Sequence, residues 1–227
     1  MTASSFAAPR LRSLARRPSR SEQPGGTAGS AAPERCDLCA EALAPDHRHL
    51  VDVQDGQVSC ACRACSLLFD RKEAGGAHYR LLPQRRLRLD GCEIDAMVWA
   101  GLGVPVDLAF FTRAEATGEV SVGYPSPLGV LRSTVDPQSW AEVRSSHPAL
   151  DDLSDDVEAL LVNRARGARE HWLVPLDDCY RLVALVRAHW KGLGGGPDVW
   201  QQIEGFFRDL STDPHPAAKE ASWPTST

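Results

Sequence analysis

The sequence predicts an α+β protein in which a small cysteine-rich module, made of a knuckle, a β-hairpin and a helix, precedes a small mixed sheet packed by about four helices. Two observations favour this class. Five of the seven cysteines lie between residues 36 and 65, and from Leu81 onward β-type segments alternate with helical patterns of apolar residues. A content of 43% hydrophobic and 24% charged residues is typical of a globular chain, which excludes a fibrous or wholly disordered protein.

The two ends of the chain differ in composition from its middle. Residues 1–33 contain five arginines and a single acidic residue, Glu22, so we expect a disordered basic tail. Residues 212–227, rich in proline, serine and threonine, are expected to form a second disordered tail. Between them, residues 34–80 form the predicted cysteine module and residues 81–211 the α+β domain. Because no apolar stretch follows the arginines or reaches the ~20 residues of a membrane span, we expect a cytoplasmic protein without membrane insertion.

The clustered cysteines form two short pairs whose spacing indicates a metal site. Cys36 and Cys39 make one C-x-x-C motif, Cys62 and Cys65 make a second, and 22 residues separate the pairs. Two thiolates at this spacing can hold one side of a tetrahedral ion, and a second pair completes its four ligands. We therefore expect a structural zinc site, with rubredoxin-like iron as the less favoured occupant because iron takes the same arrangement. Cys60 is a possible extra ligand, by exchange with Cys62, or a small apolar residue on a strand.

The residues between the two pairs predict how the pairs are brought together. His49–Val53 is expected to be a strand, Asp55-Gly56 is typical of a hairpin turn, and Gln57–Cys60 forms the return strand. Apolar residues with helical spacing follow, which places Cys62 and Cys65 in the first turn of a helix. This order resembles a treble-clef zinc finger, in which the first pair lies on a knuckle and the second pair opens the helix.

His47 and His49 stand at the start of this hairpin and allow more than one interpretation. In the simplest, they are solvent-exposed loop residues. Alternatively, they support a metal ligand through a hydrogen bond or replace one. A catalytic histidine of the HNH nuclease type is disfavoured, because the sequence has no His-Asn-His set at the usual spacing.

The larger domain is predicted from strand and helix signals in chain order. Strands are expected at residues 85–89, 106–112, 119–124 and 171–174. One helix should begin after Asp136, which precedes a proline, and another should cover residues 155–167, where Asp155 and Glu158 suit a capping box and Gly167 an end. Two further helices are indicated by apolar stripes, namely Cys179, Leu182, Val183, Val186 and Trp190, and then Trp200, Ile203, Phe207 and Leu210. Cys179 is therefore expected to be a packed thiol, and Cys92 equally inert.

No catalytic residue is predicted, because the sequence contains no G-x-S-x-G, P-loop or H-E-x-x-H motif, and we lean against an enzyme. The best polar group is a possible anion-binding set, which consists of Arg164, Arg166, Arg169 and His171. The alternative interpretation of this set is a solvated, salt-bridged helix end. A formal net charge of −5 makes nucleic-acid binding unfavourable.

Several segments resemble a family of uncharacterised bacterial proteins. They are C-D-L-C at 36–39, C-A-C-R-A-C-S-L-L-F-D-R at 60–71, Y-P-S-P-L-G at 124–129 and V-N-R-A-R-G at 162–167. The family is a domain of unknown function encoded beside nickel–iron hydrogenase genes. The resemblance implies a cytoplasmic accessory role, with a hydrogenase subunit or a maturation factor as the protein partner.

The leading hypothesis is therefore a non-enzymatic zinc-binding accessory or interaction protein that supports hydrogenase maturation or assembly. One alternative is a rubredoxin-like iron carrier in hydrogenase electron transfer, with iron at the same four sulfurs. A further alternative is a small-anion-binding domain or enzyme that uses the polar cluster between Arg164 and Arg181.

Overall fold

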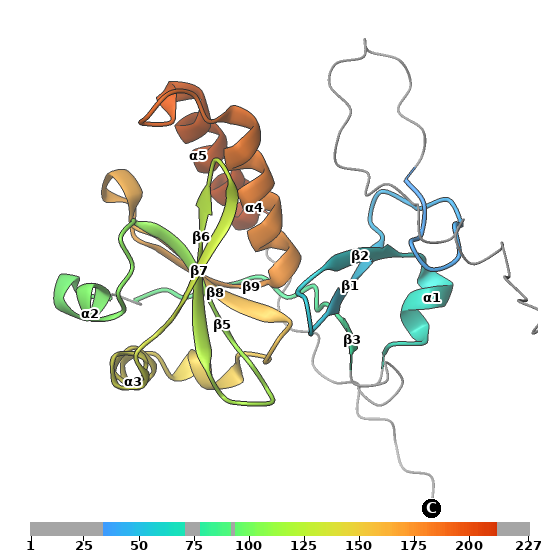
Figure 1. Ribbon diagram of the computed structural model, residues 1–227, viewed down its shortest axis with the longest axis horizontal. Coiled ribbons are helices and arrows are strands. Elements are labelled where there is room, and N and C mark those ends of the chain that lie inside the picture. The colour runs from blue at the N-terminus through green and yellow to red at the C-terminus, as the bar shows by residue number, and fades with distance from the viewer. Residues whose placement is uncertain (1–33, 71–77, 92–93, 213–227) are drawn as a thin grey trace, which may run out of the picture. The chain divides into compact units, whose positions relative to one another are not determined.

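The computed structural model describes residues 34–70, 78–91 and 94–212. The predicted N-terminal tail lies outside these residues, as do Cys92 and the predicted C-terminal tail after Thr212. Within the described residues the chain forms two antiparallel sheets and five α-helices, as Figure 1 shows. This arrangement confirms the predicted α+β class.

The cysteine module is built on the smaller sheet. Its elements are β1 (Arg48–Asp52), β2 (Val58–Ala61), α1 (Arg63–Leu67) and β3 (Tyr79–Leu81), with the strands in the order β2-β1-β3. β1 and β2 form the predicted hairpin, and Gly56 in its turn has φ of 72°, a left-handed conformation that glycine adopts without strain. The helix begins after Cys62, as predicted, whereas the third strand was not predicted.

The larger sheet has six strands in the order β4-β9-β8-β5-β6-β7, and every described pair is antiparallel. The predicted mixed sheet is therefore wrong in this respect, because hairpins rather than crossover helices join β5 to β6, β6 to β7 and β8 to β9. The strands are β4 (Leu87–Arg88), β5 (Leu108–Arg113), β6 (Val120–Ser126), β7 (Gly129–Thr134), β8 (Glu158–Asn163) and β9 (Glu170–Pro175). The edge strand β7 was not predicted.

Helices cover both faces of the larger sheet and bury two hydrophobic cores. α4 and α5 pack on one face, and α2, α3 and the short helix η2 pack on the other (Figure 1). None of the helices in the described ranges is long and apolar enough to cross a membrane. Their bounds are α2 (Ala96–Gly101), α3 (Pro137–Ser146), η2 (Pro148–Asp152), η3 (Ala165–Gly167), α4 (Leu176–His189) and α5 (Gly196–Thr212).

Three helix predictions are confirmed in detail. Asp136 is the N-cap of α3, and its carboxylate accepts a hydrogen bond from the Ser139 backbone N–H at 2.8 Å. The two predicted apolar stripes lie on α4 and α5 and line the same core. Cys179 is fully buried, and this burial raises the pKa of its thiol well above the usual value, so it is a packed thiol as expected.

The helix predicted across residues 155–167 is wrong, because the middle of this segment, Glu158–Asn163, is the central strand β8. Successive residues of β8 alternate between the two cores: Ala159 and Leu161 pack on one side, and Leu160 and Val162 on the other. A strand buried on both faces has a continuous apolar run, which periodicity alone does not distinguish from a buried helix. Glu158 does not complete a helix cap either, since its carboxylate receives two hydrogen bonds from Arg85.

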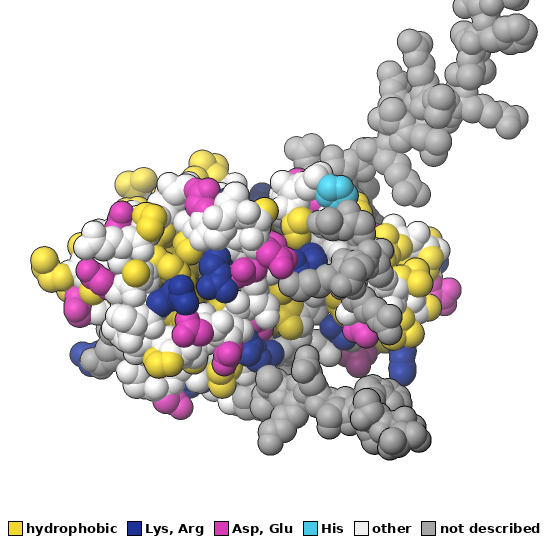
Figure 2. Space-filling view, turned by 90° about the horizontal axis from the view of Figure 1, so that it is seen from below, with side chains coloured by type: hydrophobic (Ala, Val, Ile, Leu, Met, Phe, Trp, Pro, Cys, Tyr) yellow, Lys and Arg dark blue, Asp and Glu magenta, His cyan; other side chains and the backbone are white. Residues whose placement is uncertain are grey.

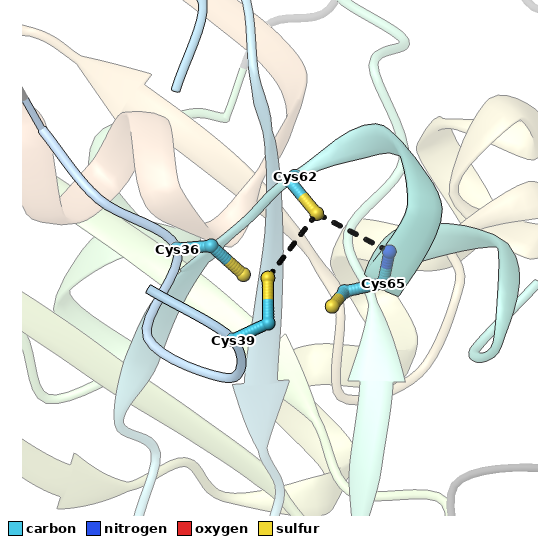
Figure 3. A group of neighbouring side chains, drawn as sticks. All are labelled: Cys36, Cys39, Cys62 and Cys65. Atoms are coloured by element: carbon cyan, nitrogen blue, oxygen red, sulfur yellow. Dashed lines mark hydrogen bonds between the residues drawn. The ribbon is translucent and has the colours of Figure 1, made fainter. Parts of the chain in front are cut away.

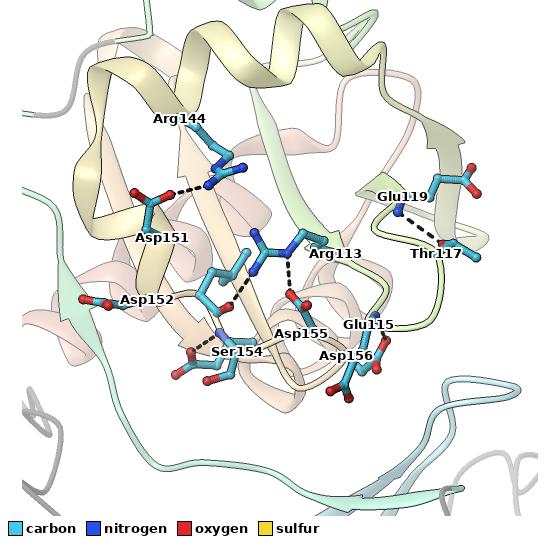
Figure 4. Close-up of polar contacts among 12 residues, drawn as sticks. Arg113, Glu115, Thr117, Glu119, Arg144, Asp151, Asp152, Ser154, Asp155 and Asp156 are labelled. Atoms are coloured by element: carbon cyan, nitrogen blue, oxygen red, sulfur yellow. Dashed lines mark hydrogen bonds and ion pairs between the residues drawn. The ribbon is translucent and has the colours of Figure 1, made fainter.

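Arginine–carboxylate contacts fasten the loop that precedes β8 (Figure 4). Arg113 on β5 donates from Nε to Asp155 Oδ1 at 2.5 Å and from Nη2 to the Leu153 carbonyl at 3.2 Å. Arg144 on α3 pairs with Asp151 in η2. These contacts hold the loop against the sheet and so fix where β8 begins.

The cysteine module packs against the larger domain through apolar and charged contacts. Val51 of β1 and Leu82, which follows β3, belong to the core under α4 and α5. The next residues carry two arginines that reach buried carboxylates: Arg85 binds Glu158, and Arg86 Nε donates to Asp178 Oδ2 at 2.6 Å. The linker from module to sheet is therefore held by two ion pairs, one to β8 and one to α4.

We expect Arg85→Met to lower the free energy of unfolding by about 3 kcal/mol, because it removes the positive charge that pairs with the buried Glu158 carboxylate and leaves it with the Ser154 N–H as a hydrogen-bond donor. Glu158 is only 1% exposed, and its Oε2 lies 2.6 Å from Arg85 Nη2. Urea unfolding followed by circular dichroism measures this loss. Arg144→Met is the matched control, since the Arg144–Asp151 pair is exposed and its loss should cost less than about 1 kcal/mol. Equal losses in both variants would contradict the prediction.

Candidate metal centre

The four paired cysteines converge on one point, as Figure 3 shows. The sulfurs of Cys36, Cys39, Cys62 and Cys65 all lie within 4.8 Å of one another. The Cys39 and Cys62 sulfurs are 3.7 Å apart. Four sulfurs placed tetrahedrally at about 2.3 Å from one ion are about 3.8 Å from each other, so this distance fits a shared cation.

The knuckle that carries the first pair is shaped by backbone hydrogen bonds. The Cys36 N–H donates to the Glu41 carbonyl, and the Ala40 N–H donates to the Cys36 carbonyl, both at 2.8 Å. Ala40 has φ of 64°, a left-handed conformation that reverses the chain after Cys39. These hydrogen bonds join the two ends of the loop that carries Cys36 and Cys39.

A reciprocal contact between Asp37 and Cys60 brings the knuckle to the second pair. The Asp37 N–H donates to the Cys60 carbonyl at 2.9 Å, and the Cys60 N–H donates to Asp37 Oδ2 at 2.7 Å. Cys60 lies on β2, two residues before Cys62, which caps α1 and accepts a bond from the Cys65 N–H at 3.4 Å. The hairpin thus carries the second pair to the knuckle.

The thiols of this group differ strongly in acidity. Burial raises the pKa of Cys36, but backbone N–H groups of Cys62, Cys39 and Leu38 donate to its sulfur and bring that pKa down to about 6. The neighbouring Cys39 and Cys62 side chains raise the pKa of Cys65 to about 12. One sulfur therefore ionises readily and another resists, because adjacent thiolates repel one another. A dication between them removes this repulsion, so the group is suited to metal binding.

This donor set fits a closed structural metal site. Four cysteine sulfurs fill all positions of a tetrahedral ion and leave none for substrate. The six cysteines of the described residues are free thiols, so no disulfide competes for these sulfurs. Zinc and iron both accept four thiolates in this geometry.

The possible extra ligand, Cys60, does not join the four sulfurs. Its thiol belongs to a second group, in which ligand atoms of His47, His49 and Cys60 lie within 4.8 Å of one another. Burial raises the pKa of Cys60, and the charges of Asp37 and Glu34 raise it further. Cys60 lies on strand β2, as the alternative interpretation of a strand residue expects.

His49 has a partner that no sequence signal indicated. Its Nδ1 lies 2.6 Å from Asp177 Oδ2, a contact between residues 128 positions apart. This hydrogen bond raises the pKa of His49. Asp177 lies in the first turn of α4, which begins at Leu176. The interpretation of His49 as an exposed loop residue is wrong, because it is half-buried on β1.

The predicted anion-binding residues are divided between two places. Arg164, Arg169 and His171 line one pocket of about 370 Å³ beside the start of α2. Arg166 lies elsewhere, with Nη1 3.7 Å from Glu204 Oε1 and its guanidinium over the Trp200 ring. The structure therefore groups three of the four residues. They lie where β8 ends and β9 begins, and not at the end of the helix that was predicted there.

Comparison with known proteins places the chain in a family. The family model described as "Family of unknown function (DUF5947)" matches residues 35–214. No curated protein and no solved structure matches the chain. The match confirms one part of the predicted resemblance, namely that the chain belongs to a family whose function is unknown.

We expect Cys65→Ser to release the metal ion of the four-sulfur group, because a serine hydroxyl is a poor replacement for a thiolate ligand. The module should then be cleaved faster in limited proteolysis, and elemental analysis should show one metal ion fewer per chain. Cys179→Ala is the control, since this buried thiol lies in the core of α4 and should leave metal content unchanged. Full metal content in Cys65→Ser would contradict the assignment.

Proposed function

Since the chain belongs to the DUF5947 family, whose function is unknown, we propose from the chemistry of its site that it is a non-enzymatic zinc-binding accessory protein. Zinc at the four sulfurs holds residues 36–65 together, and the module and the α+β domain present a docking surface to a protein partner. The observation that carries the proposal is the convergence of Cys36, Cys39, Cys62 and Cys65 within 4.8 Å.

A metal ion would add stability that the short elements of the module do not supply themselves. The sheet has three strands of five, four and three residues, and α1 has five residues. Elements this short bury too little apolar surface to offset the entropy lost on ordering. Metal binding supplies the missing free energy in such small modules.

Zinc is favoured over iron by the residues inside the pairs. Asp37-Leu38 and Arg63-Ala64 separate the cysteines, with neither proline nor glycine in either loop. The alternative of a rubredoxin-like iron carrier for hydrogenase electron transfer keeps the same four ligands. An iron–thiolate site absorbs visible light and a zinc site does not, so the two occupants are distinguished by the colour of the purified protein.

Exposed leucines of the module support a protein partner. Leu67 and Leu68, at the end of α1, are 67% and 64% exposed, and Leu38 on the knuckle is also exposed. On the face drawn in Figure 2, basic and acidic side chains lie side by side, without the continuous positive surface that nucleic acid needs. The resemblance to proteins encoded beside nickel–iron hydrogenase genes points to a hydrogenase subunit or maturation factor as that partner.

The proposal is tested by capturing purified hydrogenase subunits and maturation factors on the full chain, with metal content measured on the same sample. We expect a colourless protein that contains zinc and binds one of these partners. The double variant Leu67→Ser/Leu68→Ser should keep its zinc and lose at least about tenfold in affinity. Leu128→Ser, which changes a leucine that is 90% exposed on the turn between β6 and β7, should bind as the wild type does. Visible iron–thiolate absorption, or binding to none of these partners, would contradict the proposal.

A second candidate function, binding of a small anion, is favoured by the 370 Å³ pocket that Arg164, Arg169 and His171 share. Arg164 Nη1 is buried without a hydrogen-bond partner among the described residues, and its guanidinium lies 4.9 Å from the Trp99 ring centroid. A carboxylate or phosphate oxygen would supply the missing acceptor.

Arg169→Ala should weaken the binding of inorganic phosphate by about tenfold, because it removes one charged donor from the pocket. Isothermal titration calorimetry measures the affinity. Arg166→Ala is the matched control, since Arg166 lies outside the pocket, and it should bind phosphate as the wild type does. Unchanged affinity in Arg169→Ala would remove this candidate.

A further inference from the structure

A second set of metal-binding side chains lies beside the four sulfurs. Ligand atoms of His47, His49 and Cys60 are within 4.8 Å of one another. The hairpin explains their convergence: His49 on β1 pairs directly with Cys60 on β2. Residues opposite each other in an antiparallel pair point to the same face. His47 stands two positions before His49, and the centroids of the two rings are 4.7 Å apart.

Hydrogen bonds orient both imidazole rings with the same nitrogen free. His47 Nδ1 lies 2.9 Å from the Ala44 carbonyl, and since a carbonyl only accepts, the ring donates. His49 Nδ1 likewise donates to Asp177 Oδ2 at 2.6 Å. In the neutral rings Nε2 then carries the lone pair. Histidines that bind metals nearly always donate their other N–H to a carbonyl or a carboxylate, as both do here.

The second ring nitrogen of His47, Nε2, is buried and has no hydrogen-bond partner among the described residues. The His47 side chain is 8% exposed. The Glu34 carboxylate oxygen is 4.0 Å away, beyond hydrogen-bonding distance. Leaving such a group unsatisfied costs about 1–3 kcal/mol. A bound cation would accept this lone pair, and the Glu34 and Asp177 carboxylates would favour its charge.

A pocket of about 570 Å³ opens beside the two rings. It is lined by His47, His49 and Asp177 together with Arg86 and Tyr180. Structural zinc sites have four protein ligands, whereas sites that bind an exchangeable ligand have three and an open position. Two imidazoles and one thiol make three ligands, and the pocket leaves room for a fourth.

We propose that His47, His49 and Cys60 bind a second divalent transition-metal ion, with its fourth position open to this pocket. Two nitrogens and one sulfur suit ions of the zinc, cobalt or nickel type rather than calcium or magnesium. Asp177 is a positioning residue, since it holds the His49 ring through Nδ1. The proposal does not depend on the zinc at the four sulfurs being correctly identified.

The test is a titration of the metal-free full-length chain with Co²⁺, followed by visible absorption, together with zinc content by elemental analysis. We expect two ions per chain. His47→Ala and Cys60→Ser should each bind one, with the absorption of the four-sulfur site unchanged. His189→Ala is the matched control: its Nδ1 also lies 3.0 Å from a backbone carbonyl, that of Leu185, but it lies outside the cluster, so it should bind two ions.

The variant Asp177→Asn changes the positioning residue and removes none of the three proposed metal ligands. Loss of the carboxylate partner should weaken the second ion by about 10–100-fold and leave the first ion's affinity unchanged. Circular dichroism should show that each variant is folded.

Three results would overturn the proposal. They are one ion in the wild type, two ions in Cys60→Ser, and a changed four-sulfur spectrum in Cys60→Ser, which would mean exchange with Cys62 instead. Loss of the first ion in Cys65→Ser is a separate outcome, so failure of one site is distinguishable from failure of the other.

Discussion

The repulsion among four adjacent cysteine sulfurs is the constraint on which the module depends. The pKa of Cys36 is lowered to about 6 and that of Cys65 is raised to about 12, because the neighbouring cysteine side chains disfavour the Cys65 thiolate. A cation bound to the four sulfurs would supply a balancing positive charge and would tie the knuckle to the start of α1 across the hairpin. The register of β1 and β2, which places His49 opposite Cys60, brings the second cysteine pair to the knuckle.

The module and the larger domain form a continuous structure through buried charges. Arg85 and Arg86 follow the module and reach Glu158 and Asp178, while His49 reaches Asp177. Glu158 lies on β8 and the two aspartates lie in the first turn of α4, where carboxylates also favour the helix dipole. The helix that covers the sheet therefore also orients the histidine beside the metal module.

Glu158 shows why part of the fold escaped prediction. Its position before an apolar run fits the cap of a helix as well as the start of a strand. The outcome was decided by the neighbouring strands: β9 pairs with all of β8, and β5 pairs with its residues 160–163. Arg166 lies apart from the pocket that Arg164 lines. Its backbone is left-handed, with φ of 56°, and its guanidinium lies near the Glu204 carboxylate.

The sequence by itself determined the features that depend on neighbours along the chain. These include the two cysteine pairs, the Asp55-Gly56 turn, the Asp136 cap and the apolar stripes of α4 and α5, because spacing and capping act over a few residues. The tertiary structure alone decided that β8 is a strand and that Cys60 faces two histidines. It also brought Asp177 to a histidine 128 residues earlier. Contacts between residues so far apart in the sequence depend on which strands pair and which face of a sheet a helix covers. No local sequence pattern contains that information.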